Sequence, residues 1–125
     1  MAQSAPASRP VVLVVEDEPV LRMMAVGVVE EVGMEAIEAA DADAAIEILE
    51  ARTDVHILFS DIRMPGSMDG LKLASVVATR WPPVRIILTS GHCSKADIDL
   101  APGNLFFAKP YNFGALQTAL RSLTT

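Results

Sequence analysis

The sequence predicts an α/β domain in which a parallel sheet is covered by helices on both faces. Short, continuous apolar runs recur along the chain, at residues 11–15, 56–60 and 85–89. Runs of this length suit strands that are buried on both faces. Segments with apolar residues at helical spacing lie between them, and this alternation is typical of a doubly wound fold. With 125 residues, of which 51% are hydrophobic, the chain suffices for one such domain.

Two further strands complete the sheet, so that five are expected. Residues 35–39 and 105–108 occupy the positions at which the alternation requires a strand. The predicted order along the chain is therefore strand and helix, repeated five times.

The first predicted helix follows residues 16–18. Its apolar residues fall on one face, so we expect that face to lie in the core. The face consists of Leu21, Met24, Ala25, Val28 and Val32. Methionine at helical spacing usually fills core space, and we expect this of Met23, Met24 and Met34.

A second helix is expected to begin after Asp41, which is a candidate N-cap. Later apolar stripes at helical spacing run through residues 71–81 and 113–123.

Residues 93–104 form the weakest part of the pattern. Asp97, Asp99, Pro102 and Gly103 lie in this segment and leave at most a turn or two of helix. We therefore expect the fourth helix, between the fourth and fifth strands, to be short or absent. Residues 1–10 are small, polar and proline-containing, and we interpret them as a flexible tail before a domain at residues 11–125.

The composition excludes several classes of function. The net charge is −6 and no run of Lys or Arg occurs, so direct binding to nucleic acid is not expected. The tail has no apolar stretch that would serve as a signal peptide or membrane span. A single cysteine, Cys93, rules out an internal disulfide and a multi-cysteine zinc site. We therefore expect a cytoplasmic protein without a membrane partner.

Polar residues follow four of the five predicted strands. Glu16 and Asp17 follow the first strand, Asp61 the third, Ser90 the fourth and Lys109 the fifth. Ligands of open parallel sheets bind at the carboxyl ends of the strands, so these groups can converge. Each one alone also has an ordinary structural interpretation, because acids after strands often cap the next helix and a Lys-Pro pair usually forms a turn.

Together, these residues indicate phosphoryl transfer assisted by a metal ion. Two carboxylates about 4 Å apart repel by roughly 4 kcal/mol at an effective dielectric of 20, so Glu16, Asp17 and Asp61 in one pocket require a cation. Mg²⁺ binds through a few carboxylates and substrate phosphate oxygens, and Mn²⁺ is an alternative ion. The Asp61 carboxylate can act as the nucleophile and hold an aspartyl phosphate, while Lys109 and the metal neutralise charge and Ser90 donates to an oxygen.

The sequence resembles the receiver domain of two-component response regulators from residue 11 to about residue 123. Four motifs carry the resemblance, and they occur in the family's order: Val14-Val15-Glu16-Asp17-Glu18, Ser60-Asp61-Ile62-Arg63-Met64-Pro65 with Met68-Asp69-Gly70, Leu88-Thr89-Ser90-Gly91, and Phe106-Phe107-Ala108-Lys109-Pro110. The resemblance implies a flavodoxin-like sheet with strand order 2-1-3-4-5. It identifies residues 11–125 as a single receiver domain.

The resemblance also implies how the metal would be held. Asp61 would be both the phosphoacceptor and a metal ligand, Asp17 a direct ligand, and Glu16 a ligand through water. The backbone carbonyl of Arg63 would be another ligand. The loop from Met64 to Gly70 is one residue longer than its commonest version, and this extra residue can change the position of the backbone beside the metal.

A second group of implied roles concerns signalling. Ser90 and Phe106 would form a switch pair, in which contact between Ser90 and the phosphoryl group lets the aromatic ring turn inward. Lys109 would pair with the phosphoryl group, and the bond to Pro110 would be cis. The spacing from Ser90 to Lys109 is short for the family, which agrees with a reduced fourth helix.

The resemblance implies a signalling protein that takes its phosphoryl group from a histidine kinase or histidine phosphotransfer protein and then contacts a downstream protein partner. It would catalyse only its own phosphorylation and dephosphorylation. A phosphohydrolase of the haloacid dehalogenase-like type is one alternative, but such enzymes need an Asp where Arg63 stands. A pseudo-receiver, used only for binding, is the other. It would be expected to lack part of the acidic set or the lysine, all of which are present.

Overall fold

The computed structural model describes residues 9–91 and 103–124. These residues contain a parallel sheet of five strands in the order β2-β1-β3-β4-β5, which confirms the predicted topology. The strands are β1 (Val11–Val15), β2 (Glu35–Ala39), β3 (Ile57–Asp61), β4 (Arg85–Ser90) and β5 (Leu105–Ala108). β3 begins and ends one residue later than expected, so Asp61 lies within the strand.

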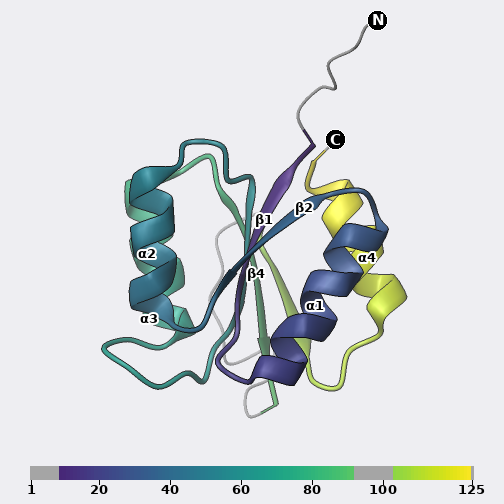
Figure 1. Ribbon diagram of the computed structural model, residues 1–125, viewed down its shortest axis with the longest axis horizontal. Coiled ribbons are helices and arrows are strands. Elements are labelled where there is room, and N and C mark those ends of the chain that lie inside the picture. The colour runs from purple at the N-terminus through teal and green to yellow at the C-terminus, as the bar shows by residue number, and fades with distance from the viewer. Residues whose placement is uncertain (1–8, 92–102, 125) are drawn as a thin grey trace, which may run out of the picture.

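Four helices in the described part of the chain cover the sheet: α1 (Pro19–Glu31), α2 (Ala42–Ala51), α3 (Gly70–Arg80) and α4 (Phe113–Ser122). Figure 1 shows α2 and α3 on one face of the sheet and α1 and α4 on the other. The helix that follows β5 is thus the fourth in the described chain. A short or absent helix was expected within residues 93–104, and most of that segment lies outside the described residues, which exclude 92–102.

Two apolar layers form the core, one on each face of the sheet. Successive residues of a strand point to opposite faces, so Leu13, Leu58 and Leu88 face α2 and α3, whereas Val12 and Ile87 face α1 and α4. All five of these side chains are fully buried. Burial on both faces is the reason that the central strands are continuously apolar in sequence.

Side chains cap three of the four described helices at their first residues. Asp41 accepts a hydrogen bond from the Ala44 amide at 2.9 Å, which confirms the predicted cap of α2. Asp69 and Asn112 cap α3 and α4 in the same way. α1 has no side-chain cap, but it begins with Pro19, whose fixed backbone angle suits a first helical position.

The first turns of α1 differ from the prediction. Leu21 and Met24 are 43% and 44% exposed and Met23 is 65% exposed, so the expectation that they fill the core was wrong. The helix packs instead through Ala25 and its neighbours further along. Its first turns lie beside the carboxyl edge of the sheet, where loops rather than strands are adjacent (Figure 1). Met34, which follows the helix, is buried as expected.

Candidate functional site

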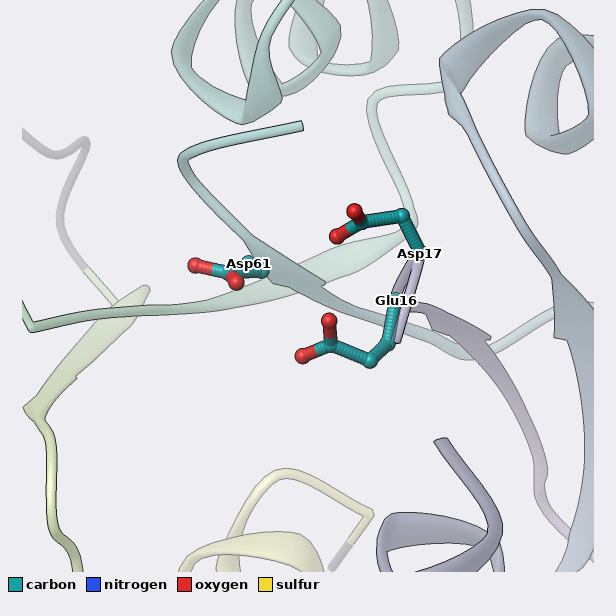
Figure 2. A group of neighbouring side chains, drawn as sticks. All are labelled: Glu16, Asp17 and Asp61. Carbon is teal, nitrogen blue, oxygen red and sulfur yellow. The ribbon is translucent and has the colours of Figure 1, made fainter. Parts of the chain in front are cut away.

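Three carboxylates converge at the carboxyl edge of the sheet. Glu16 and Asp17 follow β1 directly, and Asp61 is the last residue of the adjacent strand β3. One carboxylate oxygen from each of the three lies within 4.8 Å of the others. Figure 2 shows the three side chains directed to a common space beyond the strand ends. Glu16 and Asp61 are buried, whereas Asp17 is exposed.

Lys109 reaches this acidic cluster from the end of β5. Its Nζ donates to Asp61 Oδ2 at 2.9 Å and lies 3.5 Å from Glu16 Oε1. The Lys109 amide donates to the Ser90 carbonyl at 2.9 Å, which ties the lysine to the neighbouring strand β4. The peptide bond from Lys109 to Pro110 is cis, as the resemblance implies.

The electrostatics of the cluster favour a further cation. Burial raises the pKa of Glu16, and the Glu18 amide and the Lys109 charge counteract this only in part. Burial acts to lower the pKa of Lys109, but the hydrogen bond and charge of Asp61, with help from Glu16, outweigh it and leave that pKa raised. Among the described residues, one protonated lysine therefore faces three acids. The oxygen-only donor set and the excess negative charge fit a hard divalent ion such as Mg²⁺.

The start of α3 packs tightly against the strand end that carries Asp61. The Gly70 amide donates to the Ile62 carbonyl at 2.8 Å, and the Ile62 amide donates to the Thr89 carbonyl at 2.9 Å. A Cβ atom built on Gly70 would lie 2.2 Å from the Asp61 backbone oxygen. Only glycine fits this contact without a shift of the backbone that bears the nucleophile candidate.

The other predicted site residues lie on β4, on β5 and in the loop after β3, and they differ in burial. Ser90 is buried at the end of β4, one position beyond Thr89, the register partner of Asp61. Phe106 on β5 is half-buried and packs against the apolar layer under α2 and α3. Arg63 is exposed in the loop after β3. The switch role of Ser90 and Phe106 and the metal contact of the Arg63 carbonyl stay predictions.

Sequence reasoning missed an apolar surface beside the acidic pocket. A cavity of about 400 Å³ is lined by Glu16, Leu21, Met24, Lys109, Pro110, Tyr111 and Phe113. We call the exposed apolar residues in the first turns of α1, together with Phe113, the apolar rim: Val20, Leu21, Met23, Met24 and Phe113, of which Leu21, Met24 and Phe113 line the cavity. The pattern of α1 could have indicated it, since four apolar residues in the five positions 20–24 span too wide an arc for one buried face.

Comparison with known proteins identifies the fold family. Residues 12–121 match the family model of the response regulator receiver domain. The chain belongs to this family. The receiver domain is 33% identical over 108 residues to the nitrogen assimilation regulatory protein NtrX of Azorhizobium caulinodans, covering 81% of this chain. It is also 33% identical over 116 residues to the sensor kinase CckA of Brucella abortus, covering 90% of this chain.

A solved structure supports the same assignment. The response regulator protein TrrA of Thermotoga maritima, in complex with Mg²⁺-BeF, superposes with a TM-score of 0.82 at 25% identity, over 91% of this chain and 98% of that one. The receiver domain spans only 23% of the length of NtrX and 12% of that of CckA. What it shares with those relatives is therefore their receiver portion. Among the described residues, no helix is long and apolar enough to cross a membrane.

Proposed function

We propose that this receiver domain accepts a phosphoryl group on Asp61 from a phosphohistidine of a histidine kinase or histidine phosphotransfer protein. The observation that carries the proposal is the convergence of Glu16, Asp17 and Asp61 within 4.8 Å, with Lys109 Nζ 2.9 Å from Asp61. A nucleophilic carboxylate, a metal-binding acid pair and a cation for the phosphoryl oxygens are the groups that such a transfer needs.

Mg²⁺ is the proposed ion, with Mn²⁺ as the alternative. Asp17 and Asp61 would hold it directly, Glu16 through water, and the Arg63 carbonyl would be a further ligand. Bound there, the ion would neutralise charge on the phosphoryl oxygens. The TrrA structure in complex with Mg²⁺-BeF, from a relative of this domain, supports the assignment.

In the proposed reaction, an Asp61 carboxylate oxygen attacks phosphorus while the bond from phosphorus to the donor histidine nitrogen breaks. Lys109 would move its hydrogen bonds from Asp61 and Glu16 onto a phosphoryl oxygen, because its Nζ already lies beside the attacking group. Ser90 would donate to another phosphoryl oxygen. Phe106 would then turn inward, and the altered surface would contact a downstream protein partner.

A protein donor must cover the surface around Asp61 to bring a histidine to it. The apolar rim adjoins this position, because the cavity that three of its residues line is also lined by Glu16 and Lys109 of the acidic pocket. Exposed apolar side chains beside a reactive group suit contact with a protein. We therefore propose that the apolar rim is the surface that the phosphodonor protein contacts.

Beryllofluoride and acetyl phosphate test the proposed function. With millimolar Mg²⁺, we expect acetyl phosphate to modify the receiver domain and beryllofluoride to bind it, as measured by mass spectrometry and fluorine NMR. Asp61→Asn should remove both effects. Lys109→Ala should retain Mg²⁺ binding, which the loss of a neighbouring cation would only strengthen, and it should weaken the response to phosphorylation. If the wild type bound neither Mg²⁺ nor beryllofluoride at millimolar concentrations, the pseudo-receiver would be the better description.

The role of the apolar rim is tested with two donors of different size. Met23 is 65% exposed, so Met23→Glu should fold normally and react with acetyl phosphate at the wild-type rate. Transfer from a histidine phosphoprotein should slow at least about tenfold, since a charge would be buried in the interface. Leu71→Glu, on the opposite face of the sheet and 39% exposed, is the matched control. If Met23→Glu and Leu71→Glu slowed transfer from the histidine phosphoprotein equally, the apolar rim would not be the donor's contact surface.

A further inference from the structure

Arg22 links the acidic turn after β1 to the end of β2. It lies near the start of α1, and its Nη1 donates to the Glu16 backbone carbonyl at 2.9 Å. Its Nε donates to Glu38 Oε1 on β2 at 3.1 Å. The Arg22 side chain is only 21% exposed, whereas that of Glu38 is 54% exposed. One guanidinium therefore bridges two strands at the edge where the carboxylates converge.

The Glu16 backbone is held on both sides. Its amide donates to the Ala39 carbonyl at the end of β2, at 3.1 Å, and its carbonyl accepts from Arg22. The Glu16 carboxylate accepts from the Glu18 amide at 3.1 Å. The peptide unit that carries the Glu16 carbonyl also carries the Asp17 nitrogen, and this unit is planar. Fixing the carbonyl therefore fixes the direction in which Asp17 leaves the strand.

The contact with the carbonyl is the important part of this bridge. An ion pair as exposed as that between Arg22 and Glu38 contributes little by itself. A charged donor on a backbone carbonyl is stronger, and the planar guanidinium can serve the carbonyl and the acid at once. Arg22 does not belong to the group of residues that face the metal position, yet it touches the backbone of one of them.

We propose that Arg22 is a positioning residue: it holds the acidic turn so that Glu16 and Asp17 can share one divalent cation with Asp61. The inference rests on the proposed function, since it assumes that a divalent ion binds there. It adds a residue to the site that has no direct contact with the ion. Outer residues that orient metal ligands typically change metal affinity by about 10- to 100-fold when they are replaced.

Because Arg22 is positively charged, the two explanations of its role predict opposite changes in Mg²⁺ affinity. If Arg22 acted only as a nearby positive charge, Arg22→Gln would strengthen Mg²⁺ binding because one repelling cation is removed. If Arg22 positions the turn, Arg22→Gln should weaken Mg²⁺ binding by about tenfold, as measured by isothermal titration calorimetry. Arg22→Lys keeps the charge but lacks the fork that serves two acceptors, so it should also weaken binding.

Arg52→Gln is the matched control. Arg52 also bridges two acids, Asp54 at 2.7 Å and Glu35 at 3.6 Å, but at the other end of the sheet, where β2 begins. This variant should bind Mg²⁺ like the wild type. Thermal unfolding with EDTA establishes whether each variant is folded at the assay temperature. If Arg22→Gln is not folded, the Mg²⁺ affinity of Arg22→Lys decides whether Arg22 positions the turn.

Unchanged or tighter Mg²⁺ binding in the Arg22 variants, beside a wild type that binds, would overturn this inference and leave the proposed function intact. A wild type that does not bind Mg²⁺ at millimolar concentrations would overturn both. The two failures are therefore distinguishable in a single set of titrations.

Discussion

Replacing Lys109 with methionine should destabilise the receiver domain mainly when Mg²⁺ is absent. The substitution keeps much of the aliphatic stem and removes the cation. Lys109 Nζ lies 2.9 Å from Asp61 Oδ2 and 3.5 Å from Glu16 Oε1, so its loss removes the positive partner that the described residues give the acidic cluster. In the metal-free protein, the buried carboxylates would then repel one another without compensation.

The size of the effect follows from these distances. At an effective dielectric of 20, two carboxylates 4.8 Å apart repel by about 3.5 kcal/mol, and the attraction between Lys109 and Asp61 at 2.9 Å is about 5.7 kcal/mol. Much of that attraction offsets desolvation, and removing one partner of a buried pair costs about 3 to 5 kcal/mol. The Lys109 side chain is 26% exposed, so screening reduces this loss to about 2 to 3 kcal/mol.

Urea unfolding with EDTA and with saturating Mg²⁺ measures this difference. An ion bound at the proposed site would take over the compensation of charge, so the loss in the free energy of unfolding should fall below about 1 kcal/mol with Mg²⁺. Arg121→Met, in the last turn of α4 and exposed, should show no dependence on Mg²⁺. An equal loss for Lys109→Met under both conditions would refute the view that Lys109 and the ion compensate the same charges.

Three further substitutions test local features of the fold. Gly70→Ala should cost about 1 to 3 kcal/mol and weaken Mg²⁺ binding, because the new Cβ would lie 2.2 Å from the Asp61 carbonyl; an unchanged midpoint in urea would contradict this. Thr89 Oγ1 is buried without a hydrogen-bond partner among the residues that the structure describes, so Thr89→Val should raise the free energy of unfolding by about 1 kcal/mol, and a loss would be inconsistent with this assignment. Asn112→Ala removes the cap on the Ala115 amide and should cost about 1 kcal/mol in thermal unfolding, which Asn112→Ser should largely restore.

The strands and the acidic cluster could be predicted from sequence because both follow from local patterns and a general rule. Strands buried on both faces are continuously apolar, and the carboxyl ends of parallel strands meet at one edge. Those two statements suffice to bring Asp61 near Glu16 and Asp17, and the motif resemblance supplied the strand order.

The first turns of α1 could not be assigned in the same way. Apolar residues occur on more than one side of the helix there, so periodicity does not reveal that Leu21, Met23 and Met24 are all exposed. The contact of Arg22 with the Glu16 carbonyl depends on how α1 is set against β1 and β2, and no residue spacing encodes that. The contact of His56 is a second example. This residue precedes β3 and is exposed, but its Nδ1 accepts a hydrogen bond from the Val11 amide at 3.1 Å, which fits a structural role.

Lys109 follows directly after β5, which is an edge strand of the sheet. β5 is a four-residue strand at the edge of the sheet, and its side chains are half-buried or exposed, whereas those of β1 and β3 are fully enclosed. Edge strands open more readily than central ones. The hydrogen bond from Lys109 Nζ to Asp61 therefore links the end of an edge strand to the central strand β3, and a phosphoryl group that accepted this hydrogen bond would become part of that link.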